Sequence, residues 1–382
     1  MFRDPLAAVS TVAAGIAERA AAHDEDGSFP DEDFRALHEA GLLGLRIDER
    51  YGGAGVDPLT YARVLEAVAA AGASTGLALN MHSSATALLG HVGNEDQRER
   101  WLRPVVDEGR AFASLTSEPN VSLRKTRFST ALRRTDGGYE LDGVKHAASL
   151  AGFAQSYLVF AGDGADGAGR RALAALVPAD RDGAEVVPTW DATGMRATNS
   201  HTVRFTECFV PAEDVVEIDL DRDGNVTDLY LIGYGAVFLG IAEAAHRVAV
   251  EYAKGKRFGP DEVTIAHYPA IQRNVAEMTV RLDAMRGLVH RAAREADGVP
   301  PRERAHLLLQ AKWAGAVAAR DITDQALQVV GGAGYGRRMP LERYLRDARA
   351  GVVMPPNLDA CLETIGMLAL GLDPPGGLFG GS

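Results

Sequence analysis

The chain has 382 residues, of which 46% are hydrophobic and 24% charged, and its formal net charge is −12. This length exceeds what one compact core usually holds, so the composition predicts a globular protein of two or three domains. An acidic chain without a basic stripe is a poor match for a phosphate backbone, which argues against nucleic acid as a partner.

The cysteines and the N-terminal segment bear on the cellular compartment. Cys208 and Cys361 lie far apart and outside any CxxC pattern, so we expect neither a disulfide framework nor a zinc site. The first 20 residues place apolar side chains on one helical face and are interrupted by Asp4 and Glu18, which favours a packing helix over a signal peptide. No segment is apolar enough to span a membrane, and we therefore expect a cytoplasmic protein.

An N-terminal helical domain is predicted over residues 1–111. Ser28–Asp31 and Asp57-Pro58 are helix start signals, and Gly41 is a stop signal. A small-residue stretch over 69–89 and a charged helix over 94–106 complete this domain.

A middle β-domain is predicted over residues 112–220. Phe128–Arg133 and Tyr139–Lys145 flank a Thr-Asp-Gly-Gly turn, which is a strong hairpin signal. Three more strands are expected over Ser156–Ala161, Ala172–Val177 and Thr202–Phe209, and residues 163–171 form a glycine-rich connector.

Helical periodicity returns after Asp219 and predicts a C-terminal four-helix bundle within residues 221–382. Its helices are expected over Tyr230–Lys254, Pro269–Glu295, Arg302–Val329 and Asn357–Leu370. The order helical, β, helical predicts an α+β multi-domain fold.

Several short motifs then occur in a definite order. They are Tyr51-Gly-Gly-Ala-Gly55, Ser117-Glu118-Pro119, Asp142-Gly-Val-Lys145, Gly194-Met195-Arg196, Phe258-Gly259, Gln328 with Gly331, Gly332 and Gly334, and Arg346-Asp347. In this order the chain resembles the acyl-CoA dehydrogenase family over nearly its whole length. The resemblance implies a homotetramer or homodimer with FAD at the subunit interface, an acyl thioester of CoA or of a carrier protein as substrate, and an electron-transfer partner.

The resemblance also implies which residues bind the flavin and the substrate. The implied flavin contacts are Thr116, Ser117, Ser149, Arg257, Phe258, Gln272, Gln328, Gly331 and Gly332. Glycine permits close approach of the backbone to a ligand, although a helix end and turn would favour the same residues. Arg124 and Lys125 suit a phosphate on CoA or on a pantetheine arm, or simply a solvated loop, and His146 suits either a substrate contact or an ordinary surface position.

The sequence departs from the family pattern at the position of the base. The glutamate that removes the α-proton of the thioester in most of the family falls at Pro355, and proline cannot accept a proton. Some members carry this base on the first bundle helix, where Tyr230 and the nearby Asp228 are the candidates. Asp228 would otherwise be a helix cap.

The flavin motif departs from the family pattern as well. The usual arginine before Phe258 is Gly255, although Lys256 and Arg257 stand beside it. The first of two glutamines is Pro269, and a tryptophan that flanks the ring is Ala147. The arginine and the glutamine that are lost are expected near the nucleotide half of FAD, so their loss would suit an enzyme that binds FMN.

Three functions follow as hypotheses. The first is a flavin-dependent oxidoreductase, of a biosynthetic pathway, that dehydrogenates an acyl thioester or oxidises its α-carbon. The second is a flavin monooxygenase on the same fold, which needs no α-proton base and takes reduced FMN or FAD from a partner reductase. The third is a flavin-free enzyme or scaffold. No histidine pair has the i, i+4 spacing with a carboxylate, so we expect no metal site.

Overall fold

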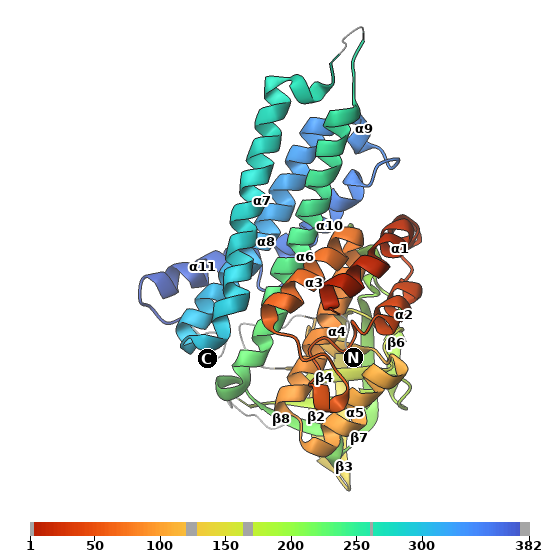
Figure 1. Cartoon of the computed structure of the whole chain (residues 1–382). Helices are drawn as coiled ribbons and strands as arrows, with labels where there is room; N and C mark the ends of the chain where they lie inside the picture. The colour runs from red at the N-terminus through yellow and green to blue at the C-terminus, as the bar shows by residue number, and fades with distance from the viewer. Residues whose placement is uncertain (1–3, 120–127, 163–170, 260–262, 375–382) are drawn as a thin grey trace.

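The computed structural model describes residues 4–119, 128–162, 171–259 and 263–374, with only the backbone described at 171 and at 219–229. The N-terminal part of the chain is helical, and the strands lie at one end of the molecule (Figure 1). A long helical bundle formed by the C-terminal part extends to the other end. The predicted order of helical, β and helical parts is confirmed.

The N-terminal part contains α1 (Pro5–Asp26), α2 (Asp31–Glu39), α3 (Pro58–Ala71), α4 (Ala73–Val92) and α5 (Glu95–Glu108). The predicted start signal at Asp57 is confirmed, because its carboxylate accepts hydrogen bonds from the N–H groups of Leu59 and Thr60 at 2.9 and 3.0 Å. Asn94 begins α5 with a reciprocal capping box to Gln97. Helix α4 is buried over most of its length, which explains its small residues.

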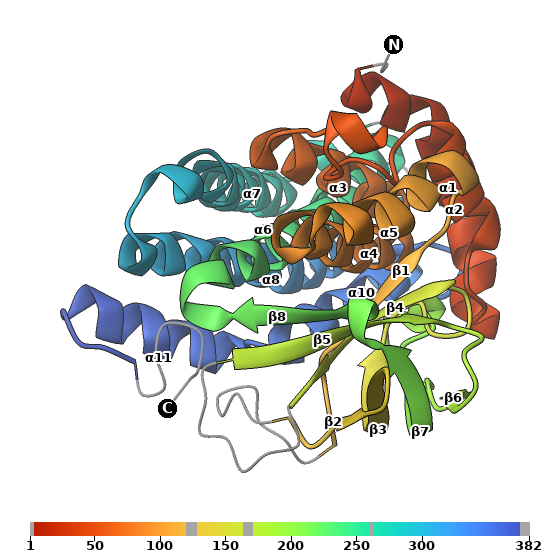
Figure 2. The same ribbon diagram turned by 90° about the horizontal axis from the view of Figure 1, so that it is seen from below.

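Eight strands form two four-stranded sheets in the described part of the chain. They are β1 (Phe112–Leu115), β2 (Ala131–Thr135), β3 (Gly138–Ala148), β4 (Ser156–Ala161), β5 (Arg171–Pro178), β6 (Ala184–Val187), β7 (His201–Pro211) and β8 (Val215–Asp219). The orders are β1-β4-β5-β8 and β2-β3-β7-β6, and only the β1–β4 pairing is parallel. Both sheets lie on one side of the helices, with β5 and β8 nearer to them than β3 and β7 (Figure 2).

The predicted hairpin is confirmed. Thr135 pairs with Gly138, and Gly137 in the turn has a φ of 76°, which glycine adopts without steric strain. Strands β1, β6 and β8 were not expected from the sequence. They contain only four or five residues, which is too short to display an alternating pattern.

The C-terminal bundle is built from α6 (Leu220–Gly255), α7 (Pro269–Glu295), α8 (Pro301–Val330) and α10 (Leu341–Val353), followed by α11 (Leu358–Ala369). The short α9 (Gly332–Tyr335) follows α8. Backbones of α6 and α8 approach closely, since a Cβ added to Gly315 would lie 2.2 Å from the carbonyl oxygen of Gly235. Helix α10, which carries the Arg346-Asp347 motif, was not predicted from the sequence.

Apolar side chains of all three parts join one large buried cluster, and a second cluster fills the interior of the bundle. Within residues 4–119, 128–162, 171–259 and 263–374, none of the helices combines the length and apolar character that a membrane span requires.

Candidate functional site

Four of the predicted contacts meet at the edge of the middle domain. Thr116 and Ser117 follow β1, while His146 and Ser149 lie at the end of β3. The N–H of His146 donates to the carbonyl oxygen of Ser117 at 3.0 Å, which holds the two segments together. Ser149 is buried and the other three are half-buried. The tertiary fold therefore gathers side chains from two separate stretches of sequence into one group.

A buried ion pair lies next to this group in the sequence and in the fold. The Nζ atom of Lys145 lies 2.6 Å from Oε1 of Glu118, and both side chains are almost completely buried. Glu118 also accepts hydrogen bonds from the N–H groups of Ser129 and Thr130 at 2.6 and 3.0 Å. Burial alone would raise the pKa of Glu118, but the hydrogen bonds from Lys145 and Ser129 hold this pKa well below its usual value. The pair fixes the backbone that carries Thr116 and Ser117.

A chain of hydroxyl groups continues from Ser149. Its Oγ lies 2.9 Å from Oγ of Ser200, which lies 2.8 Å from Oγ1 of Thr198. Thr198 in turn donates to the carbonyl oxygen of Met195 at 2.9 Å. The sequence analysis missed Thr198 and Ser200, for which the only sequence signal was their position directly after the Gly-Met-Arg motif.

The remaining flavin candidates form a second group at the end of the bundle farther from the sheets (Figure 1). Arg257 and Phe258 are exposed and follow α6, and Gln328 is exposed in the last turn of α8. Nε2 of Gln272 donates to the carbonyl oxygen of Ala266 at 3.0 Å, so this side chain folds back onto the loop before α7. The two candidate groups come from opposite ends of α6.

The turn after α8 has the backbone shape that the cofactor hypothesis requires. Gly331 has φ 67° and ψ −149°, a combination open essentially to glycine alone. A Cβ added to Gly331 or Gly332 would meet nothing within 4 Å, so this face of the turn is free for a ligand. Gly331 N–H also donates to Leu327 O at 2.7 Å, so the turn ends the helix as well. The open glycine turn and the hydroxyl-lined edge fit the nucleotide and ring portions of a flavin.

The position of the usual base offers no proton acceptor. Pro355 is exposed in the connection between α10 and α11. Beneath that connection the fully buried Lys312 donates from Nζ to the carbonyl oxygen of Gly351 at 2.9 Å. A groove of about 470 Å³ lies beside it, with Trp313, Val353 and Leu362 among its lining residues.

The alternative base positions lie on α6. Tyr230 is half-buried, and its ring packs edge-to-face on Tyr234 at 5.4 Å between centroids. Its carbonyl oxygen accepts from Nδ2 of Asn80 at 3.3 Å. The helix-cap interpretation of Asp228 is wrong, because α6 begins at Leu220 and Asp228 lies inside the helix. The Asp228 side chain, and Arg124 and Lys125 altogether, fall outside the described residues.

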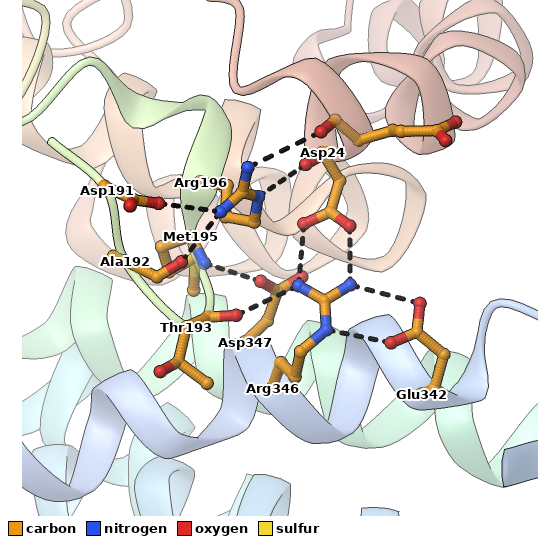
Figure 3. A network of polar contacts seen from close by, with 10 residues as sticks. Asp24, Asp191, Ala192, Thr193, Met195, Arg196, Glu342, Arg346 and Asp347 are labelled. Atoms are coloured by element: carbon orange, nitrogen blue, oxygen red, sulfur yellow. Dashed lines mark hydrogen bonds and ion pairs between the residues drawn. The ribbon is translucent and has the colours of Figure 1, made fainter. Parts of the chain in front are cut away.

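Two of the family motifs meet in a joint between the three parts of the chain (Figure 3). The Asp347 carboxylate on α10 accepts from the Met195 N–H at 2.6 Å. Arg346 pairs with Asp24 of α1 at 2.5 Å and donates to the Thr193 carbonyl oxygen at 3.0 Å. These motifs therefore hold α1, the loop before β7 and α10 together. Among the described residues, no group of three or more His, Cys, Asp or Glu side chains is arranged to hold a metal ion.

Comparisons with known proteins agree with this architecture. Three family models match: "Acyl-CoA dehydrogenase, N-terminal domain" over residues 1–109, "middle domain" over 113–208 and "C-terminal domain" over 232–354. Benzylmalonyl-CoA dehydrogenase of Aromatoleum aromaticum is 34% identical, and the match covers 87% of this chain and 88% of that protein.

Two solved structures extend the comparison. Butyryl-CoA dehydrogenase from Megasphaera elsdenii has a TM-score of 0.88 with 26% identity, covering 97% of this chain and 99% of the other. KijD3, solved with FMN and dTDP-3-amino-2,3,6-trideoxy-4-keto-3-methyl-D-glucose, has a TM-score of 0.87 with 31% identity, covering 98% and 95%.

The helical, β and helical layers, together with these matches, define a class of flavoenzyme. The chain belongs to the acyl-CoA dehydrogenase family. Acyl-CoA dehydrogenases use FAD, and the KijD3 structure contains FMN, so both flavins that the sequence analysis named occur among the relatives.

Proposed function

We propose that this protein is a flavin-dependent monooxygenase of the family, supplied with reduced FMN or FAD by a partner reductase. The observation that carries this proposal is the exposed Pro355, which puts no carboxylate where the α-proton of a thioester is usually removed. Oxygen transfer from a reduced flavin does not need that base. The similarity to KijD3, which was solved with FMN and an amino sugar nucleotide, supports the same conclusion.

The chain's own residues would bind and orient the cofactor. Thr116, Ser117 and Ser149 would hold the ring, which supplies the redox chemistry when bound. The exposed group of Arg257, Phe258, Gln272, Gln328, Gly331 and Gly332 would hold the phosphate and nucleotide portion. Of the substrate candidates, His146 lies beside Ser117, and Arg124 and Lys125 are proposed for a phosphate group of the substrate.

A second chain would complete the site. Helix α6 has 36 residues and is therefore about 54 Å long. It starts directly after β8 and ends just before Arg257, so this arginine is distant from the sheet end of its own chain. A single flavin could contact both groups of candidate residues if one chain supplied the group at the sheet end and a second chain supplied the group at the far end of the bundle. A homodimer or homotetramer is therefore part of the proposal. The proposed compartment is the cytoplasm.

A second candidate is oxidation of an acyl thioester on CoA or a carrier protein, with electrons passed to an electron-transfer partner. The 34% identity with a CoA-thioester dehydrogenase favours it. The base would then be Asp228 or Tyr230 on α6. Replacing Asp228 by Asn should abolish turnover and leave flavin bound, whereas unchanged turnover would remove Asp228 from consideration.

One set of assays separates these functions. The purified protein is titrated with FMN and with FAD, and the complex is then supplied with NADH and a flavin reductase in air. Oxygen-dependent formation of an oxygenated product from amino sugar nucleotides or acyl thioesters would support the monooxygenase. Anaerobic bleaching of the bound flavin by an acyl thioester alone would instead support dehydrogenation. Absence of binding by either flavin would contradict both candidates and favour the flavin-free hypothesis.

A further inference from the structure

Arg343 on α10 is a buried cation whose donors have no acceptor in the described part of the chain. It is 9% exposed, and its guanidinium lies over the ring of Tyr344, 5.5 Å from the centroid. Among the described residues, no group accepts a hydrogen bond from this guanidinium and no carboxylate forms an ion pair with it. Asp347, one turn further along the helix, accepts from the Met195 N–H instead. A buried guanidinium has five N–H donors, and leaving them without acceptors is costly.

The N-terminus of α4 is a second buried set of donors. This 20-residue helix begins after Gly72, and no side chain caps it. Gly72 is buried, and Ala73 and Thr75 are 8% and 3% exposed, so water has little access to the N–H groups of the first turn. A helix N-terminus carries a partial positive charge and attracts anions.

A small cavity joins these two sets of donors. Its lining includes Arg343 together with Gly72, Ala73, Ser74 and Thr75 of the α4 N-terminus. The cavity offers a volume of about 10 Å³ to the centre of a water-sized sphere, which is room for about one such particle. A monatomic ion fits this space, whereas phosphate and sulfate are too large for it.

The other ionisable groups that line the cavity already have partners. Oδ1 of Asp33 accepts from Arg19 at 2.6 Å, and Oδ2 accepts from the Thr75 hydroxyl at 2.7 Å. Nδ1 of His23 lies 2.8 Å from Oγ of Ser28. Because Arg19 balances the charge of Asp33, the buried guanidinium and the helix N-terminus leave the cavity with a positive potential.

We propose that this cavity binds one small inorganic monovalent anion, of the size of chloride, between the Arg343 guanidinium and the first turn of α4. The anion accepts hydrogen bonds from both and so satisfies donors that the packing of α4 and α10 removes from water. Arg346 and Asp347 follow Arg343 by three and four residues and therefore share its face of α10. The anion thus links α4 to the same helix face that joins α1 and the loop before β7. None of the proposed flavin contacts takes part, so the inference does not depend on the proposed function.

The test measures how the stability of the full-length protein depends on chloride. Sodium chloride is replaced stepwise by sodium gluconate at constant ionic strength, so general screening is unchanged, and gluconate is too large for the cavity. We expect the melting temperature to rise by about 3 °C between chloride-free buffer and about 300 mM chloride, because an anion that binds only the folded state stabilises it. Crystals grown in sodium bromide should show an anomalous diffraction peak between Arg343 and the first turn of α4.

Four variants locate the effect. Arg343→Met should reduce the rise to below about 1 °C. Arg349→Met is the matched control on the same helix, since the Arg349 side chain is 43% exposed and pairs with Asp324, and it should keep the full rise. Ser74→Asp places a fixed carboxylate in the first turn of α4, where it substitutes for the anion. This variant should be insensitive to chloride and Ser74→Asn should remain sensitive, which tests the site even where Arg343→Met fails to fold.

Three results would overturn the inference. They are a wild-type melting temperature that is the same in chloride and gluconate, an equal chloride dependence of the wild type and Ser74→Asp, and bromide crystals without an anomalous peak in the cavity. Flavin titration of the same samples reports separately on the proposed function.

Discussion

Lys145 and Glu118 form an ion pair whose side chains are 0% and 1% exposed. Removing Lys145 leaves the buried Glu118 carboxylate without a counter-charge, although the N–H groups of Ser129 and Thr130 still donate to it. We expect Lys145→Met to lower the free energy of unfolding by about 3 kcal/mol. Urea unfolding followed by circular dichroism measures this loss. The double variant Lys145→Met/Glu118→Gln should recover part of it, and a single-variant loss below about 0.5 kcal/mol would contradict the expectation.

His82 is a core histidine that should make stability depend on pH. The N–H of Phe112 donates to its Nδ1 at 3.0 Å, and its Nε2 donates to the Leu43 carbonyl oxygen at 3.0 Å. Burial lowers the pKa of His82 to about 4, from 6.5 in the unfolded chain. The folded state therefore binds fewer protons between these values, and stability falls as pH falls from 6.5 to 4.

The size of this effect follows from the shift. A change of roughly 2.5 pKa units corresponds to about 3 kcal/mol, lost progressively across that window. Thermal unfolding from pH 7.5 to pH 4 measures it. His82→Gln keeps one donor and one acceptor without the titration, so its stability should fall less steeply with acid. Equal slopes for the two proteins would rule out His82 as the cause.

At the scale of elements, Gly194 controls how the loop before β7 packs on α10. A Cβ at Gly194 would lie 2.3 Å from the carbonyl oxygen of Arg346, so the loop or the helix would have to move. We expect Gly194→Ala to cost about 2 kcal/mol, the usual cost of overpacking, and to loosen the joint made by Asp347 and Met195. Melting temperature and limited proteolysis measure these effects.

A glycine in an open position provides the matched control. Gly287 lies within α7, and a Cβ there would meet nothing within 4 Å. Gly287→Ala should raise stability by about 0.5–1 kcal/mol, because alanine restricts the unfolded chain and favours the helix. If both substitutions had the same effect, close packing at Gly194 would not be the determinant.

At the scale of the whole molecule, the exposed end of the bundle should determine association. Phe258 and Tyr335 are 54% and 80% exposed there, which is unusual for large aromatic side chains unless they meet a partner. We expect Phe258→Glu to shift the protein toward the monomer in sedimentation velocity and to weaken FMN binding at least tenfold.

The control for this substitution lies elsewhere on the surface. Phe209 of β7 is 43% exposed, and Phe209→Glu should change neither association nor flavin affinity. A monomeric Phe258→Glu protein that still bound FMN normally would show that one chain holds the whole site.

Local patterns in the sequence were sufficient to predict the long helices of the bundle, one hairpin and the family. Helical periodicity identified α6, α7 and α8, and the Thr-Asp-Gly-Gly turn identified the β2–β3 hairpin, because these signals depend on neighbouring residues. The motif order likewise predicted the family, and the proline at position 355 predicted the missing carboxylate.

Only the tertiary structure decided which side chains meet. Met195 and Asp347 are 152 residues apart in sequence, and Ser149 and Ser200 are 51 apart. Whether such groups form a joint or a hydroxyl chain depends on strand register and on how a loop packs against a helix, and neither leaves a periodic trace in the sequence. The composition and motifs of this chain therefore determined its architecture and family, whereas the contacts between the side chains of its candidate site were determined by packing between distant segments.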